Sequence, residues 1–248
     1  MATPGILKQA VGAALGLSDQ LEKIDVHLRN LREAGYITKA KTGRGAAEMS
    51  TSDAANLLVA VASSELVKDS VTSVKEYGSL AADPDSVSIH GLRGLLLEIA
   101  ERRNIDPRTL KGAELSSARA RELLGAAGLP LLDLPERHTF MEAARRLLTL
   151  PSPHAIFGDG APTSRHRPPS ETRYLFVRFF LPYRAVSVVY GFNRWFQVHL
   201  LYGSLPVRDA RAAWDLRSLQ TVGRLLSVRV VDKVALDKIA RALLPSAI

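Results

Sequence analysis

The 248-residue chain contains no cysteine. This absence excludes disulfides, thiolate catalysis, iron-sulfur clusters and zinc sites built on cysteine, and it favours an intracellular protein. The chain also lacks an uncharged apolar run of roughly 18 residues, the length needed to cross a bilayer. Its first 17 residues hold no long apolar segment of the kind found in signal peptides. We therefore expect a cytoplasmic protein without a membrane partner.

Signatures of common enzymes are missing as well. The sequence holds no P-loop, no dinucleotide-binding glycine pattern after a strand, no nucleophile elbow and no EF-hand loop. Its six histidines show no i, i+4 pair that would bind a metal on one helix. Asp133, Glu136 and His138 cluster, but residues 134–136 are typical of a helix start, where carboxylates are favoured. The sequence predicts no catalytic residue, metal or cofactor; the remaining enzyme alternative is a site whose histidines and carboxylates converge from distant segments.

Charge is unevenly distributed along the chain. The formal net charge is +8 and the pI about 9.9, values that favour a polyanionic partner. Residues 1–50 hold 7 basic and 5 acidic side chains, residues 51–159 hold 12 and 15, and residues 160–248 hold 14 and 5. The C-terminal third therefore supplies most of the excess positive charge.

The apolar pattern changes at residues 158–172, a segment with three prolines and a basic cluster at residues 164–167 that is typical of a linker. Before this segment, apolar residues recur at helical spacing. After it, the sequence is strand-like at residues 174–180, 185–190 and 196–202. The tail from Val207 is helical again, and its last helix is expected to begin after a cap at Asp232. The sequence predicts a mainly α protein with a small antiparallel β module, in the α+β class. We expect a winged helix-turn-helix at 1–50, a helical and dimerising domain at 51–157, a linker at 158–172 and a basic α+β module at 173–248.

Residues 4–48 carry the most informative pattern. A short helix opened by Pro4 leads to a turn at Gly16, and a second helix follows, with a cap at Ser18 or Asp19 and a capping box formed with Glu22. A strand at Tyr36 and Ile37 and a basic, glycine-containing loop then precede a third helix. The buried stripe of the second helix is expected at Leu21, Ile24, Leu28 and Leu31.

This order resembles that of winged helix-turn-helix DNA-binding regulators. The run from Leu17 and Ser18 to Glu33-Ala34-Gly35-Tyr36-Ile37 is similar to their recognition helix and wing, and the continuation into Met49–Leu58 is similar to the MerR-type arrangement. The resemblance covers about the first 60 residues, and the chain is also similar to regulator-like proteins of phages and alphaproteobacteria. The resemblance to winged helix-turn-helix regulators implies that the second helix enters the major groove while the wing contacts phosphates. The DNA-binding residues expected from it are Ser18, Gln20, Lys23, His27, Arg29, Asn30, Lys39, Lys41 and Arg44.

One feature opposes this interpretation. Residues 18–34 contain three basic and four acidic side chains, so the expected recognition helix is net negative, which disfavours contact with phosphates. The alternative is a helical hairpin that contacts another protein.

A second candidate surface lies between Arg173 and Tyr202, where ten of the fifteen aromatic residues gather. Arginine interleaved with aromatic rings on a sheet is how single-stranded nucleic acid is bound. The residues expected there are Arg173, Arg178, Arg184, Arg194 and Trp195. The favoured alternative is that the rings fill the core of the sheet; an effector pocket or a dimer interface is a third option.

The sequence thus favours a nucleoid-associated, sequence-specific double-stranded DNA-binding transcriptional regulator of phage or mobile-element genes. We expect a homodimer, since one short helix reads few bases, and leave any effector open. The alternative is a nucleoprotein adaptor that contacts protein through its N-terminal domain and single strands through its C-terminal sheet.

Overall fold

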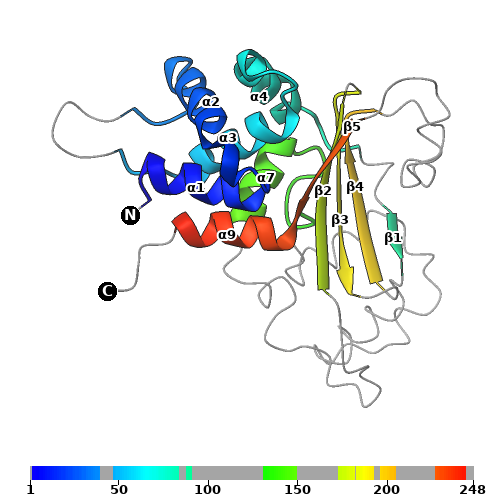
Figure 1. Cartoon of the computed structure of the whole chain (residues 1–248). Coiled ribbons are helices and arrows are strands. Elements are labelled where there is room, and N and C mark those ends of the chain that lie inside the picture. Colours follow the sequence, from blue (N-terminus) through cyan, green and yellow to red (C-terminus); the bar gives the residue numbers. More distant parts are fainter. Residues whose placement is uncertain are drawn as a thin grey trace, which may run out of the picture.

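The computed structural model describes residues 2–39, 47–83, 88–90, 131–149, 173–181, 183–192, 196–204 and 227–243. In these residues, helices pack against one face of an antiparallel β-sheet (Figure 1). This arrangement confirms the α+β class expected from the sequence. In the described part of the chain, no helix is long and apolar enough to span a membrane.

The helical layer combines α-helices with two short 3₁₀ turns. Its elements are α1 (Pro4–Ala14), η1 (Ser18–Gln20), α2 (Leu21–Glu33), α3 (Thr51–Ser63), η2 (Val67–Asp69), α4 (Ser70–Gly78), α7 (Phe140–Leu148) and α9 (Lys233–Leu243). Two expected starts are confirmed: α1 opens at Pro4, and the Asp232 carboxylate accepts a hydrogen bond from the Ala235 amide at 2.8 Å at the start of α9. The helix start expected near Glu136 falls later, since α7 begins at Phe140 after a Thr139 cap.

Helix α3 is the centre of the helical layer. Eleven of its 13 residues are buried, because neighbouring helices and the sheet surround it. Ser50 and Asp53 form a capping box at its start, and the Asp53 carboxylate also accepts hydrogen bonds from the amide and hydroxyl of Thr38. The start of α3 therefore fixes the segment that follows α2.

The sheet has the strand order β1-β4-β3-β2-β5, with every neighbouring pair antiparallel. Strands β2 (Arg173–Leu181), β3 (Ala185–Phe192) and β4 (Phe196–Tyr202) confirm the three expected from period-two patterning. Strand β1 (Ser88–His90) extends one edge of the sheet. Strand β5 (Ser227–Asp232) corrects the helix expected there: its β-branched residues pair with β2, from Phe176↔Asp232 to Leu181↔Ser227.

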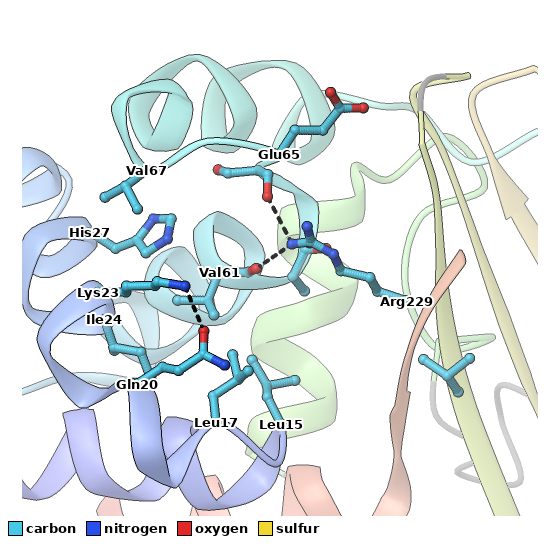
Figure 2. A pocket seen from close by; sticks show the side chains of 13 residues that line it. Leu15, Leu17, Gln20, Lys23, Ile24, His27, Val61, Glu65, Val67 and Arg229 are labelled. Carbon is cyan, nitrogen blue, oxygen red and sulfur yellow. Dashed lines mark hydrogen bonds between the residues drawn. The ribbon is translucent and has the colours of Figure 1, made fainter. Parts of the chain in front are cut away.

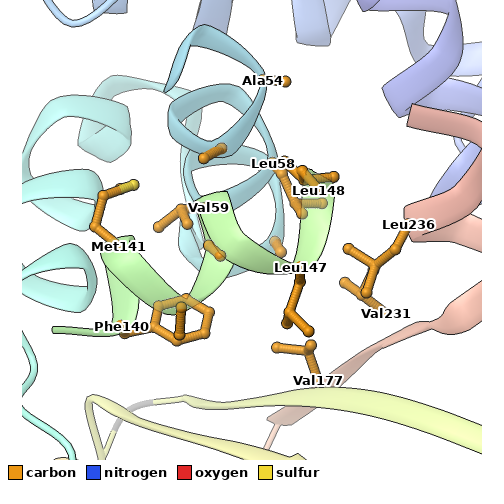
Figure 3. Packing of buried hydrophobic residues seen from close by; sticks show 14 of the residues in the cluster. Ala54, Leu58, Val59, Phe140, Met141, Leu147, Leu148, Val177, Val231 and Leu236 are labelled. Atoms are coloured by element: carbon orange, nitrogen blue, oxygen red, sulfur yellow. The ribbon is translucent and has the colours of Figure 1, made fainter. Parts of the chain in front are cut away.

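Helices α3 and α9 contact strands β2 and β5, and α7 lies between part of α3 and strand β2 (Figure 3). Phe140 of α7 meets Phe179 of β2 edge to face, with ring centroids 5.5 Å apart. Each such fully buried side chain contributes about 1.5–3 kcal/mol to stability.

One buried apolar cluster extends from Ala2 in the N-terminal segment to Ile239 in α9. It includes residues from three of the segments predicted from the sequence, and α1 packs along α9 (Figure 1). The N-terminal helices and the last helix therefore share one core. The linker predicted at residues 158–172 lies outside the described residues.

Candidate nucleic-acid interface and neighbouring pocket

Helices α1 and α2 are joined by a tight turn that depends on glycine. Gly16 has φ +67°, a conformation that costs other residues energy, and the Leu17 amide donates to the Gly12 carbonyl at 2.7 Å across the end of α1. Gly12 lies where the helices approach closely, since a Cβ there would come within 2.6 Å of the Leu21 side chain. Of the predicted apolar stripe, Ile24, Leu28 and Leu31 are buried and Leu21 is half-buried.

The start of α2 differs from the sequence prediction. Residues Ser18–Gln20 form a 3₁₀ turn, the α-helix begins at Leu21, and no side chain caps it. The capping box expected from Asp19 and Glu22 is therefore wrong. The Gln20 amide instead donates a hydrogen bond to the Leu17 carbonyl at 2.9 Å. The 3₁₀ turn thus satisfies a backbone N–H at the helix start that would otherwise need a capping side chain.

The segment after α2 is also not the strand that was expected. The Tyr36 carbonyl accepts a hydrogen bond from the Asn56 side chain at 2.6 Å, and the Thr38 amide donates to Asp53 at 2.7 Å. Because side chains of α3 take up these backbone groups, the segment runs along α3 rather than pairing with a strand. Residues 40–46, which include Lys41 and Arg44 of the expected wing, lie outside the described residues.

The remaining predicted DNA-binding residues divide into two groups. Ser18, Lys23, Arg29 and Lys39 are exposed and Gln20 is half-exposed. His27 is buried, and Asn30 is half-buried with its amide donating to the Val67 carbonyl at 3.0 Å. The structure therefore turns His27 and Asn30 toward η2 and α4, away from the exposed position expected of them.

The hydrogen bonds around His27 define its tautomer. The Ser70 hydroxyl donates to the Val67 carbonyl, so its oxygen accepts a hydrogen bond from His27 Nδ1–H at 2.8 Å. Burial, followed by the nearby positive charge of Arg229, lowers the pKa of His27 to about 4. His27 is thus a neutral side chain that joins α2 to the start of α4.

Arg229 is a residue that sequence reasoning missed. It projects from β5 to the C-terminal end of α3, where its Nη1 donates to the carbonyls of Val61 at 2.9 Å and Ser64 at 2.8 Å (Figure 2). A positive charge is favoured at this end of a helix. The sequence signal for Arg229 is its place in a run of valines. If that run is assigned to a strand with one face toward the core, the arginine becomes a candidate for a specific contact.

A pocket of about 450 Å³ lies beside α2, between the end of α3 and β5 (Figure 2). It is lined by both apolar and charged side chains, and two of the predicted DNA-binding residues, Gln20 and Lys23, are among them. The Lys23 ammonium donates to the Gln20 amide oxygen at 2.9 Å.

The structure describes the side chains of two of the five residues expected on the second surface, Arg178 and Arg184. Arg184 pairs with Glu76 of α4 at 3.1 Å, while Arg178 is half-buried and burial lowers the pKa of its guanidinium. The side chains of Arg173, Arg194 and Trp195 lie outside the described residues. Aromatic rings in the strands are largely internal: Phe179, Phe180, Tyr190 and Tyr202 are fully buried. These four rings therefore belong to the core, as the alternative to a nucleic-acid surface expected.

Two of the three clustered residues, Asp133 and His138, have structural partners. Asp133 accepts hydrogen bonds from Arg146 at 2.7 and 2.9 Å, and His138 contacts the Tyr202 hydroxyl at 2.8 Å in the core. In the described parts of the chain, no three histidine or carboxylate side chains are placed to hold a metal ion. Comparison of the chain with protein-family models, curated proteins and solved structures finds no match.

Proposed function

We propose that the chain is a double-stranded DNA-binding transcriptional regulator that reads its site with α2. The observation that carries this proposal is the α1-turn-α2 unit, which leaves Ser18, Gln20 and Lys23 accessible at the N-terminal end of α2. That end of a recognition helix is where side chains reach base edges in the major groove. Arg29 and Lys39 are exposed on the same segment and would contact phosphates. His27 and Asn30 are not part of this proposed interface.

An ion pair reduces the acidity that opposed this interpretation. Lys8 of α1 lies 3.2 Å from the Asp25 carboxylate of α2, so one of the acidic side chains of the helix is neutralised within the unit. Lys41 and Arg44, which follow α2 closely in the sequence, would add positive charge. These charges support attraction to phosphates at moderate salt.

A salt titration of duplex binding tests this proposal. We expect the triple variant Lys39→Ala, Lys41→Ala, Arg44→Ala to weaken binding and to reduce the slope of log affinity against log salt by about 0.9 per lost phosphate contact. The matched control is the triple variant Lys75→Ala, Lys238→Ala, Arg241→Ala, which removes the same charge from exposed positions on α4 and α9. Equal slopes for the two triples would show that the wing does not contact phosphate, and the proposal would fail.

Sequence specificity requires a separate experiment. DNA crosslinked to the protein in its native cells is recovered and sequenced, and the Gln20→Ala, Lys23→Ala variant is processed in parallel. We expect enrichment at a few discrete sites that the variant loses, because base contacts by α2 are worth about 1–3 kcal/mol each. Uniform recovery along the genome would contradict a sequence-specific regulator.

The outer face of α2 favours one other function, a nucleoprotein adaptor whose N-terminal helices contact a protein. Val26 is 39% exposed, with Glu22 and Glu33 exposed on the same face of the helix. An exposed apolar side chain between carboxylates suits a basic protein partner better than phosphates. For this adaptor, we expect Val26→Arg to abolish partner capture and leave the salt slope of DNA binding unchanged. In the regulator, the same change would raise DNA affinity.

A further inference from the structure

The pocket beside α2 is bounded by elements far apart in the sequence. Its wall is formed by the α1–α2 turn, the end of α3, η2 and strand β5, so it lies between the helical layer and the edge of the sheet (Figure 2). Its volume of about 450 Å³ is within the roughly 300–1,000 Å³ typical of small-molecule sites. Much of the lining is aliphatic: Leu15, Leu17, Ile24, Val61, Val67 and Val230.

Two cationic side chains line this aliphatic pocket. Lys23 is exposed, and Arg229 is half-buried. The hydrogen bonds of Arg229 to α3 all start from Nη1, so Nε and Nη2 have no hydrogen-bond partner in the described part of the chain. A guanidinium held in place by one nitrogen can still offer its other N–H groups to a carboxylate.

A buried polar atom in the lining is also without a partner. Ser64 is 4% exposed, and its hydroxyl has no hydrogen-bond partner among the residues that the structure describes. Buried hydroxyls are nearly always hydrogen-bonded, since an unmet one costs about 1–3 kcal/mol. Ser64 lies next to Arg229, whose Nη1 binds the Ser64 carbonyl at 2.8 Å. Ser64 and the guanidinium of Arg229 therefore lie at the same end of the pocket.

We propose that this pocket binds a small monoanionic carboxylate with an aliphatic body. The carboxylate would accept hydrogen bonds from Arg229 and Ser64 and pair with Lys23, while the body packs against the leucine and valine side chains. Glu65 is the acidic residue of the lining, so with Lys23 and Arg229 the charged lining is net +1. A ligand with one negative charge balances this net charge of the lining. A dianion would keep one negative charge without a partner in the pocket.

The ligand would also regulate DNA binding, an extension that rests on the proposed function. Lys23 and Gln20 line the pocket and belong to the proposed DNA interface. A carboxylate paired with Lys23 withdraws that charge from DNA, so ligand and duplex oppose each other, each weakening the other by the same factor.

Binding is tested on the full chain without DNA, with octanoate as the probe and 1-octanol as the neutral control of equal chain length. Octanoate is titrated into ¹⁵N-labelled protein and followed by NMR. We expect saturable shifts at the amides of Lys23, Ser64 and Arg229, with a dissociation constant in the low millimolar range and binding by octanol at least tenfold weaker.

Two variants of equal charge change complete the test. Lys23→Glu, at an exposed position, is expected to weaken octanoate binding at least tenfold, and Lys75→Glu on α4 is expected to leave it unchanged. Absence of saturable shifts at the pocket, equal affinity for octanol, or equal loss in both variants would each overturn the proposal.

A second arm separates this inference from the function on which its regulatory part rests. Duplex affinity is measured with and without saturating octanoate, and we expect at least a threefold loss that Lys23→Glu abolishes. If octanoate binds at the pocket and no duplex is bound in either state, the DNA proposal fails and the carboxylate site stands. If octanoate binds and duplex affinity does not change, the regulatory part is wrong.

Discussion

The imidazole of His27 lies between α2 and the start of α4, where burial and then the charge of Arg229 hold its pKa near 4. In the unfolded chain a histidine has a pKa of about 6.5. Between these values the unfolded chain binds a proton that the folded chain excludes. The stabilisation from neutral His27 is therefore fully present above about pH 6.5 and is lost as the pH falls toward 4.

We expect this single group to remove about 3 kcal/mol from the free energy of unfolding between pH 7 and pH 4. Urea denaturation at pH 4.5, 5.5 and 7 measures the loss. In the His27→Asn variant, where the amide can still donate to Ser70, the dependence on pH in this window should be clearly shallower. Identical pH dependence in both proteins would mean that the pKa of His27 is the same in the folded and the unfolded chain.

At the scale of the element, Arg229 connects strand β5 to helix α3. It is separated from Ser64 by 165 positions, and its hydrogen bonds satisfy carbonyls that the end of α3 leaves without partners. Arg184 connects the sheet to α4 in a different way, through an exposed ion pair with Glu76. The two arginines make a matched comparison of a buried carbonyl contact with a surface pair.

We expect Arg229→Met to lower the free energy of unfolding by about 2–3 kcal/mol, because it leaves buried carbonyls unpaired at the end of α3. Arg184→Met should cost at most about 1 kcal/mol, since surface ion pairs contribute little. Urea denaturation of both variants at pH 7 gives the comparison. Equal losses would show that the carbonyl contacts of Arg229 add nothing beyond a surface charge.

The sequence predicted best the elements whose residue pattern has one clear period. The stripe of α2 at Ile24, Leu28 and Leu31 is buried, as its helical spacing indicates. Strand β4 was predicted from its alternating residue types, although residues 198–202 are all buried. Strand β5 was missed because a short valine run suits helix or strand, and its partner β2 is about 50 residues earlier in the chain.

The candidate site was predicted less completely than the fold. Helical spacing predicts the direction in which each side chain of α2 points. It does not predict which later segment of the chain packs against each side of the helix. His27 and Asn30 were therefore assigned to the DNA side, whereas η2 and α4 cover them. The pocket could not be predicted at all, because Lys23 and Arg229 are brought together only when β5 joins the sheet.

For the whole molecule, the shared core means that the N-terminal unit depends on the end of the chain. Leu7 and Val11 of α1 are fully buried, and α1 packs along α9, which contributes Leu236 and Ile239 to the same cluster. Removing α9 would expose the apolar side of α1 to water, and each Å² of exposed apolar surface lowers the free energy of unfolding by about 25 cal/mol. The α1–α2 pair should therefore lose stability when the chain is shortened at its far end.

We expect a chain ended after Asp232 to lose hydrogen-exchange protection in α1 before the central strands β2 and β3 lose theirs, because those strands keep their backbone partners in the sheet. The matched control is Val234→Ala, which shortens an exposed side chain of α9 and keeps its buried face. Full protection of α1 in the shortened chain would show that the N-terminal helices fold independently. The loss expected here would instead mean that changes in α9, more than 200 residues away in sequence, alter how the chain presents α2.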